Sequence, residues 1–146
     1  MTNIITASIE FSFKGKNLSP SITIELDPYL INGGNFPELC QIIAKQNNFD
    51  FYSYEYEMMQ AQTISFSNAQ GLVAEFIHDG ILNINAFETA WHENAALEKL
   101  LVIAEQHMNI TNFNQHLELK HALLEAYTLG KKDARSRDAR LPLKFI

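Results

Sequence analysis

Residues 7–26 read ASIEFSFKGKNLSPSITIEL, and this stretch decides the fold that we expect for the start of the chain. Apolar residues occupy every second position from Ala7 to Phe13 and again from Ile22 to Leu26. Such alternation places all the apolar side chains on one face of a β-strand. Because the turn-rich segment 14–20 separates the two runs, the stretch predicts a β-hairpin with one buried face. Asp27-Pro28 should end it, since proline lacks the amide donor that a ladder needs.

A short helix is expected after the hairpin. Asn35 can cap its N-terminus, and Glu38 three residues later completes a capping box. Pro37 falls in the first turn, where its missing N–H does no harm. Apolar residues follow at helical spacing, and Asn47-Asn48 suits a left-handed stop after about three turns.

Four more strands are predicted before the C-terminal third. They are expected at residues 52–58, 63–67, 72–77 and 81–85. The alternation is strongest in the first of these, which reads YSYEYEM. Asp79-Gly80 favours a tight hairpin turn between the last two. An alternative assignment puts a helical turn near Glu57–Ala61, and the pattern leaves both assignments open.

The C-terminal third shows the 3.6-residue periodicity of helices. One helix should begin at Ala86, with Asn85 as its cap, and end at Asn109. A second should run from about Asn112 and end at Gly130. Because the connection is short, we expect an antiparallel helical hairpin. The expected core between this hairpin and the sheet consists of Phe87, Trp91, Leu97, Leu101, Leu117 and Leu124.

The predicted order of elements is ββ-α-ββββ-αα, which indicates an α+β fold. We expect an antiparallel sheet of five to six strands with the helices packed on one face, as a two-layer sandwich. Residues 1–130 should form a single domain, because 146 residues suffice for one core without disulfides. Residues 131–146 should be a basic C-terminal tail, extended or docked, since most of them show no apolar periodicity.

The formal net charge of −6 is unevenly distributed. Residues 1–130 carry five Lys against fifteen Asp and Glu, whereas residues 131–146 carry six Lys and Arg against two Asp. An acidic body repels phosphate backbones, so nucleic acid is not an expected partner except through the tail. The acidic balance instead favours a basic protein partner.

The sequence predicts a cytoplasmic protein with no membrane partner. Its longest apolar run, at residues 100–104, is far shorter than the ~20 residues that span a bilayer. The first residues lack the basic and apolar regions of a signal peptide. Cys40 is the only cysteine, which excludes a disulfide framework.

We expect no metal site and no cofactor. His92-Glu93 resembles the start of the zinc-protease motif His-Glu-x-x-His, but position 96 is alanine. Glu118 and His121 have the spacing of a di-iron motif, which requires a second copy that the chain lacks.

Three residues are candidates for catalysis. His78 and Asp79 fall in a predicted turn, where active-site residues tend to gather. His116 lies in the apolar arc of its predicted helix, where burial could shift its pKa. Each also has a structural explanation, because Asp-Gly forms turns and a histidine at a core edge can simply be hydrogen-bonded.

The most distinctive local feature is a run of tyrosines. Tyr52, Tyr54 and Tyr56 would share one face of a strand, with Glu55 and Glu57 on the other. Tyrosine is enriched at interfaces, so this run could bind a partner or a cationic ligand. The alternative is a strand face packed under the helices.

The chain matches no catalytic motif, which favours a small acidic protein that acts by non-covalent association, through self-assembly or a protein partner. The alternative is a small metal-independent enzyme or ligand-binding protein with a cleft lined by His and Tyr. We further expect a homo-oligomer, with a dimer favoured. A six-stranded sheet with apolar side chains on both faces needs a second cover, which a twofold partner commonly supplies.

Overall fold

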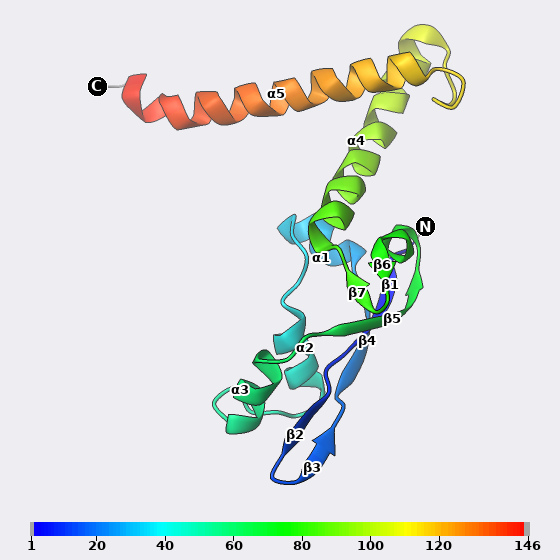
Figure 1. The fold of residues 1–146 in the computed structure, drawn as a ribbon. Helices are drawn as coiled ribbons and strands as arrows, with labels where there is room; N and C mark the ends of the chain where they lie inside the picture. The colour runs from blue at the N-terminus through cyan, green and yellow to red at the C-terminus, as the bar shows by residue number, and fades with distance from the viewer. Residues whose placement is uncertain (1, 145–146) are drawn as a thin grey trace. The chain divides into compact units, whose positions relative to one another are not determined.

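The computed structural model describes residues 2–144, and for residues 137–144 it describes the backbone alone. Its antiparallel strands and five α-helices make an α+β fold, as predicted. The chain divides into two compact units, residues 1–89 (unit 1) and residues 90–146 (unit 2). All the strands belong to unit 1 (Figure 1). The last two residues of the predicted tail lie outside the described part of the chain.

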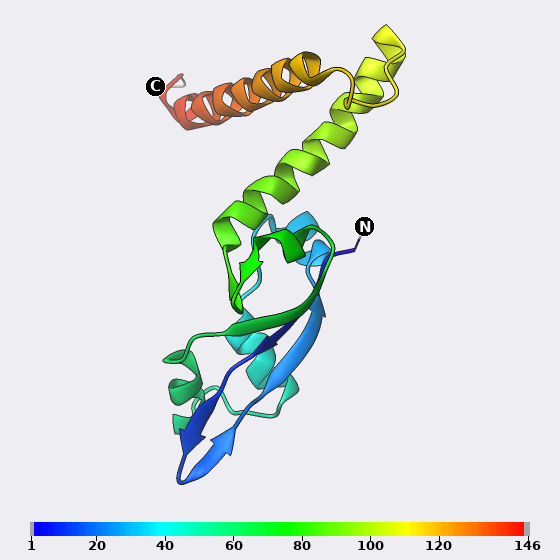
Figure 2. The same cartoon turned by 45° about the vertical axis from the view of Figure 1, so that its right-hand side comes forward.

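The predicted N-terminal hairpin is confirmed. It consists of β1 (Ile4–Ser8), β2 (Phe11–Phe13), β3 (Lys16–Leu18) and β4 (Ser21–Glu25). β1 pairs antiparallel with β4, and β2 pairs antiparallel with β3 beyond it (Figure 2). Lys14 and Gly15 have positive φ angles of 51° and 78°, the backbone that a two-residue hairpin turn requires.

The strands form three small sheets, so the prediction of one sheet with five to six strands is wrong. β5 (Ser65–Gln70) pairs with the free side of β1 and gives a three-stranded sheet of order β4-β1-β5. β6 (Ile77–His78) and β7 (Ile81–Leu82) form a separate hairpin, with Asp79 and Gly80 in its turn as predicted. Two segments expected to be strands are helical instead, which removes them from the sheet.

The helical segments of unit 1 are short. They are α1 (Asp27–Gly33), α2 (Leu39–Gln46), α3 (Tyr54–Gln60) and the 3₁₀-helix η1 (Leu72–Phe76). The N-cap of α2 is Glu38 rather than the predicted Asn35. The predicted stop is confirmed, because Asn48 has a φ of 63°. η1 replaces the strand expected at residues 72–77.

The strand expected at residues 52–58 is wrong, because most of this segment forms α3, in line with the alternative of a helical turn near Glu57–Ala61. Ser53 is the N-cap, and its Oγ accepts a hydrogen bond from the Tyr56 amide at 3.2 Å. Glu55 and Glu57 lie in the first turn, where negative charge is favourable. Tyr56 and Met59 are buried at the i and i+3 positions, a spacing that a helix places on one side.

Unit 2 consists of the greater part of α4 (Ile84–Met108) and all of α5 (Leu117–Lys144). The cap of α4 is Asn83, whose Oδ1 accepts from the Ala86 amide at 3.2 Å, and not the predicted Asn85. Asn109 has a φ of 52° and is the predicted stop. α5 continues through Gly130, so the predicted helix end there is wrong.

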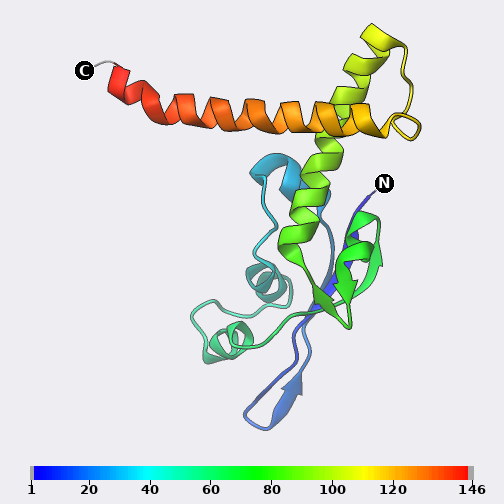
Figure 3. The same ribbon diagram turned by 45° about the horizontal axis from the view of Figure 1, so that its top comes forward.

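α4 and α5 do not form the predicted antiparallel hairpin. Their connection, residues 109–116, is longer than expected, and α5 does not run back along α4 (Figures 1 and 3). The two helices meet at a cluster of four buried residues, Leu100, Ala104, Ile110 and Phe113. Leu97, Leu101 and Leu124 pack against this cluster, but it contains no strand residue, so it is not the predicted core between the helices and the sheet.

The other three predicted core residues do not join this cluster. Trp91 is half-buried, and its ring lies 5.1 Å from that of His92. Leu117 is 55% exposed, because α5 only begins there. Phe87 is fully buried, but it belongs to unit 1, where its ring packs near Phe36 and Phe76. No described helix is long and apolar enough to cross a membrane.

Candidate functional site

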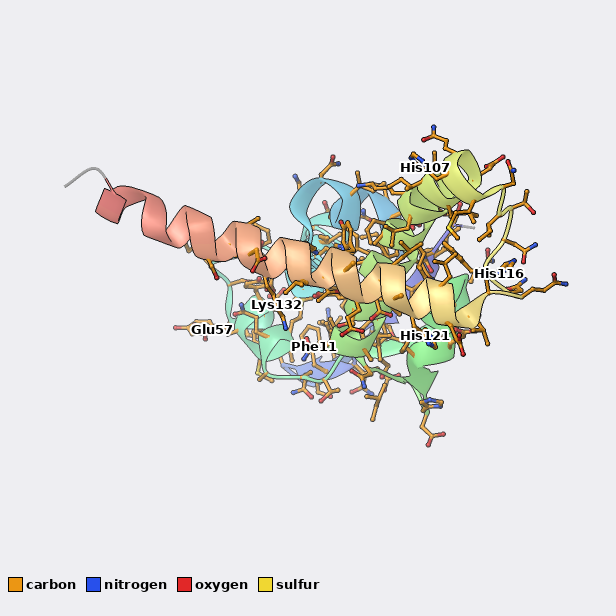
Figure 4. The ribbon with its side chains drawn as sticks, turned by 90° about the horizontal axis from the view of Figure 1, so that it is seen from above. Phe11, Glu57, His107, His116, His121 and Lys132 are labelled. Atoms are coloured by element: carbon orange, nitrogen blue, oxygen red, sulfur yellow. The ribbon has the colours of Figure 1, made fainter. Side chains whose placement is uncertain are left out.

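Unit 1 exposes aromatic side chains in an acidic setting at the start of α3. Tyr52 is 98% exposed and Tyr54 is 76% exposed, which is far more than a packing role requires. The carboxylates of Asp50, Glu55 and Glu57 lie in the same short segment. We call these five residues the acidic aromatic surface. Glu57 points away from the body of unit 1 in Figure 4.

Local hydrogen bonds fix the backbone beneath this surface. The Asp50 carboxylate accepts from the Tyr52 amide at 2.9 Å, which makes a turn closed by the side chain. The Ser53 amide and hydroxyl both donate to the Asp50 carbonyl, at 3.0 and 2.6 Å. The same hydroxyl caps α3. Tyr52 and Tyr54 therefore project from an ordered turn and not from a loose loop.

Aromatic packing anchors the segment to the rest of unit 1. The rings of Phe49 and Phe11 lie 6.0 Å apart, which ties the segment to β2. The rings of Phe51 and Tyr56 lie 5.2 Å apart, and Tyr56 is only 6% exposed. Of the three predicted tyrosines, Tyr56 is thus a core residue, and the structure separates it from the exposed pair.

Tyr56 and Cys40 interact beneath the surface. Burial raises the pKa of the Cys40 thiol, and the negative charge of Glu38 raises it further. Burial also raises the pKa of the Tyr56 hydroxyl, with smaller contributions from the charges of Cys40 and Glu38. Both groups therefore keep their protons at neutral pH, and Cys40 lacks the thiolate character of a nucleophile.

The segment that carries the acidic aromatic surface is rich in negative charge. Within unit 1, no Lys or Arg occurs from residue 46 to residue 89, whereas six Asp and Glu do. Unit 1 as a whole has three Lys against ten Asp and Glu. The exposed tyrosines therefore lie in a negative field that favours a cation.

The structure places the predicted catalytic residues at exposed positions. His78 ends β6, and Asp79 adopts a φ of 52° in the adjoining turn, which explains its presence by backbone geometry. His116 lies just before α5 and is exposed rather than in an apolar arc. His78 and Asp79 belong to unit 1 and His116 to unit 2.

A cleft of about 290 Å³ lies among the elements of unit 1. Its lining comes from residues around α2, from β5 and from the first turns of α4, and comprises Phe36, Pro37, Glu38, Leu39, Cys40, Ile64, Phe66, Ile84 and Glu88. The Glu88 carboxylate accepts from the Phe36 amide at 2.9 Å and holds the rim together. No His or Tyr lines this cleft. It therefore differs from the cleft lined by His and Tyr that we expected if the protein were an enzyme or a ligand-binding protein.

Unit 2 has a groove of about 430 Å³ between α4 and α5. We call it the fork groove; it is lined by Glu93, His121, Leu124, Glu125, Thr128, Leu129 and Lys132. His121 and Lys132 lie along one side of α5 in Figure 4. In the sequence, the spacing of residues 121, 125, 128 and 132 is that of side chains on one face of a helix. This face was not predicted, because the helix was expected to end at Gly130, before Lys132.

Within the described residues, no group of three or more His, Cys, Asp or Glu side chains could hold a metal ion. Comparison with known proteins finds no matching family model, no matching curated protein and no matching solved structure.

Proposed function

We propose that this protein acts by non-covalent association in the cytoplasm, and that its acidic aromatic surface binds a segment of a protein partner rich in Arg and Lys. The observation that carries the proposal is the near-complete exposure of Tyr52 beside Tyr54, Glu55 and Glu57. Leaving such rings in water forfeits hydrophobic stabilisation, unless a partner covers them.

The chemistry of the surface indicates the kind of partner. An Arg guanidinium can stack on a tyrosine face while it forms a hydrogen-bonded pair with a carboxylate. The surface offers both groups within six residues, on a turn that is already ordered. Pre-ordering lowers the entropy lost on binding.

A labelled hexa-arginine peptide tests this proposal by fluorescence anisotropy at ~0.15 M salt. Each exposed cation–π contact contributes about 0.5–1 kcal/mol, so replacing Tyr52 and Tyr54 together with alanine should weaken binding about 5- to 30-fold. Glu57→Lys should weaken it as well. The matched controls, Tyr29→Ala and Glu75→Lys, change the same residue types elsewhere in unit 1 and should have little effect. Equal binding by the Tyr52→Ala/Tyr54→Ala variant would contradict the proposal.

We also propose that the protein self-associates as a homodimer. Unit 2 supports this, because among its described residues only Ala96, Leu100, Ala104, Ile110 and Phe113 are buried. Its helices span 25 and 28 residues, yet Val102, Ile103, Met108, Leu117 and Leu129 are largely exposed. Long helices owe most of their stability to packing of an apolar face, and a second copy would supply it. Sedimentation equilibrium of the full chain gives its solution mass.

A further inference from the structure

We infer that the fork groove is the self-association surface, where α5 of one copy packs antiparallel against α5 of a second copy about a twofold axis. The inference rests on the proposed homodimer and names the contact that makes it. It is independent of the acidic aromatic surface, which lies in unit 1.

One side of α5 carries the groove. His121, Glu125, Thr128 and Lys132 follow one another at intervals of four, three and four residues, so they lie in one stripe along the helix. Glu125, Thr128 and Lys132 are all exposed. The stripe is therefore available to a partner over about three helical turns.

The centre of the stripe is apolar. Leu129 is 60% exposed, and the neighbouring Leu124 is half-buried. The Thr128 hydroxyl donates to the Leu124 carbonyl at 2.9 Å, so its polar group is satisfied within the helix and its methyl group is free to pack. A second helix could bury this centre without stranding a polar atom.

The charges on either side of the centre are self-complementary. Glu125 and Lys132 lie at equal distances along the sequence from the midpoint between Thr128 and Leu129, with Glu125 before it and Lys132 after it. A twofold axis at that midpoint places Glu125 of one copy opposite Lys132 of the other, and the reverse pair forms by symmetry. Because Glu125 and Lys132 are opposite in charge and seven residues apart, they favour pairing with an identical helix that runs in the opposite direction.

The choice of a second copy over an unrelated helix follows from this symmetry. A groove for a basic or an acidic partner would carry one sign of charge. This groove has Glu93 on α4, but its stripe along α5 carries Glu125 and Lys132 on opposite sides of Leu129. Unit 2 as a whole is nearly neutral, with eight Lys and Arg against seven Asp and Glu. Two copies can therefore approach without strong repulsion.

Single charge reversals test the pairing by sedimentation velocity across micromolar concentrations. Glu125→Lys alone and Lys132→Glu alone each place like charges opposite one another twice in a homodimer. Each should raise the dimer dissociation constant by about tenfold or more. The Glu125→Lys/Lys132→Glu double variant restores both pairs and should dimerise like the unaltered chain.

Mixing the two single variants gives a sharper result. A heterodimer of the Glu125→Lys and Lys132→Glu chains has opposite charges at both contacts, so the mixture should dimerise where each variant alone does not. Glu98→Lys and Lys99→Glu on α4 are the matched controls, since both residues are exposed and neither lines the groove. Circular dichroism of each variant checks that the helices are retained.

Three outcomes would overturn the inference. Dimerisation of both single variants at the unaltered affinity would show that the contact lies elsewhere, although the proposed homodimer would stand. A mixture that dimerises no better than its components would exclude the antiparallel pairing. A monomer at all concentrations for the unaltered chain would remove both the homodimer and this surface, without affecting the binding of basic peptides by unit 1.

Discussion

The Ser53 hydroxyl accepts a hydrogen bond from the Tyr56 amide at 3.2 Å, and this contact starts α3. The same hydroxyl donates to the Asp50 carbonyl at 2.6 Å, so one side chain joins the preceding turn to the helix. Without it, the first turn of α3 would leave an amide donor unsatisfied.

Ser53→Ala should therefore lower the free energy of unfolding by about 0.5–2 kcal/mol, the usual effect of removing an N-cap. Urea denaturation followed by circular dichroism measures the change. Ser65→Ala, at an exposed position of β5, is the matched control and should change stability little. Equal stabilities for the two variants would mean that the cap does not hold α3.

Asn3, just before β1, is a buried polar residue that joins α1 and η1 by hydrogen bonds. Its amide and side-chain nitrogen donate to the Asp27 carboxylate at 2.7 and 2.9 Å, and its Oδ1 accepts from the Val73 amide at 3.0 Å. Asn3→Ala would leave the Val73 amide buried without a partner, at about 1–3 kcal/mol. Thermal unfolding should show this loss, whereas the exposed Asn17→Ala should melt near the unaltered chain. A loss under ~0.5 kcal/mol would indicate that water replaces the Asn3 side chain.

Leu100 and Leu117 provide a test of the core of unit 2. Leu100 is 8% exposed and Leu117 is 55% exposed. Leu100→Ala should cost about 2–5 kcal/mol through lost burial and a residual cavity. Leu117→Ala should cost far less, and guanidinium denaturation of both variants makes the comparison. Similar losses would show that Leu117 is packed in solution, contrary to its exposure here.

Alkaline pH should destabilise unit 1 through Cys40 and Tyr56. The pKa values of both groups are raised above the ordinary values of 9.0 and 10.0, chiefly by burial. The unfolded chain therefore loses these protons first as the pH rises. Their contribution to stability is complete below pH 9 and is lost progressively as the pH rises through the folded pKa values.

Denaturation midpoints measured from pH 7 to pH 11 check this expectation. The decline above pH 9 should be smaller in Cys40→Ala and in Tyr56→Phe than in the unaltered chain, since each removes one titrating group. A decline of the same size in both variants would assign the alkaline sensitivity to other groups.

Backbone chemistry made several features predictable from short stretches of sequence. Asn48 and Asn109 end helices with positive φ, and Asp79-Gly80 forms a hairpin turn, because these residues tolerate left-handed backbone conformations. The hairpin of residues 7–26 was predictable from its long alternation. The exposure of Tyr52 and Tyr54, on which the proposed function rests, was not predictable from the sequence.

The sequence by itself determined the α+β class, the N-terminal hairpin and the places where the chain turns, since each depends on the conformational preferences of adjacent residues. Only the tertiary structure decided that residues 54–60 are helical. Their alternation suits a strand, but Tyr56 and Met59 are buried on one side of a helix that Ser53 caps. The tertiary structure also decided that α5 continues beyond Gly130. This is possible because one glycine disfavours a helix by only ~1 kcal/mol. Whether a side chain is buried depends on residues distant in the chain, and a local pattern contains no information about them.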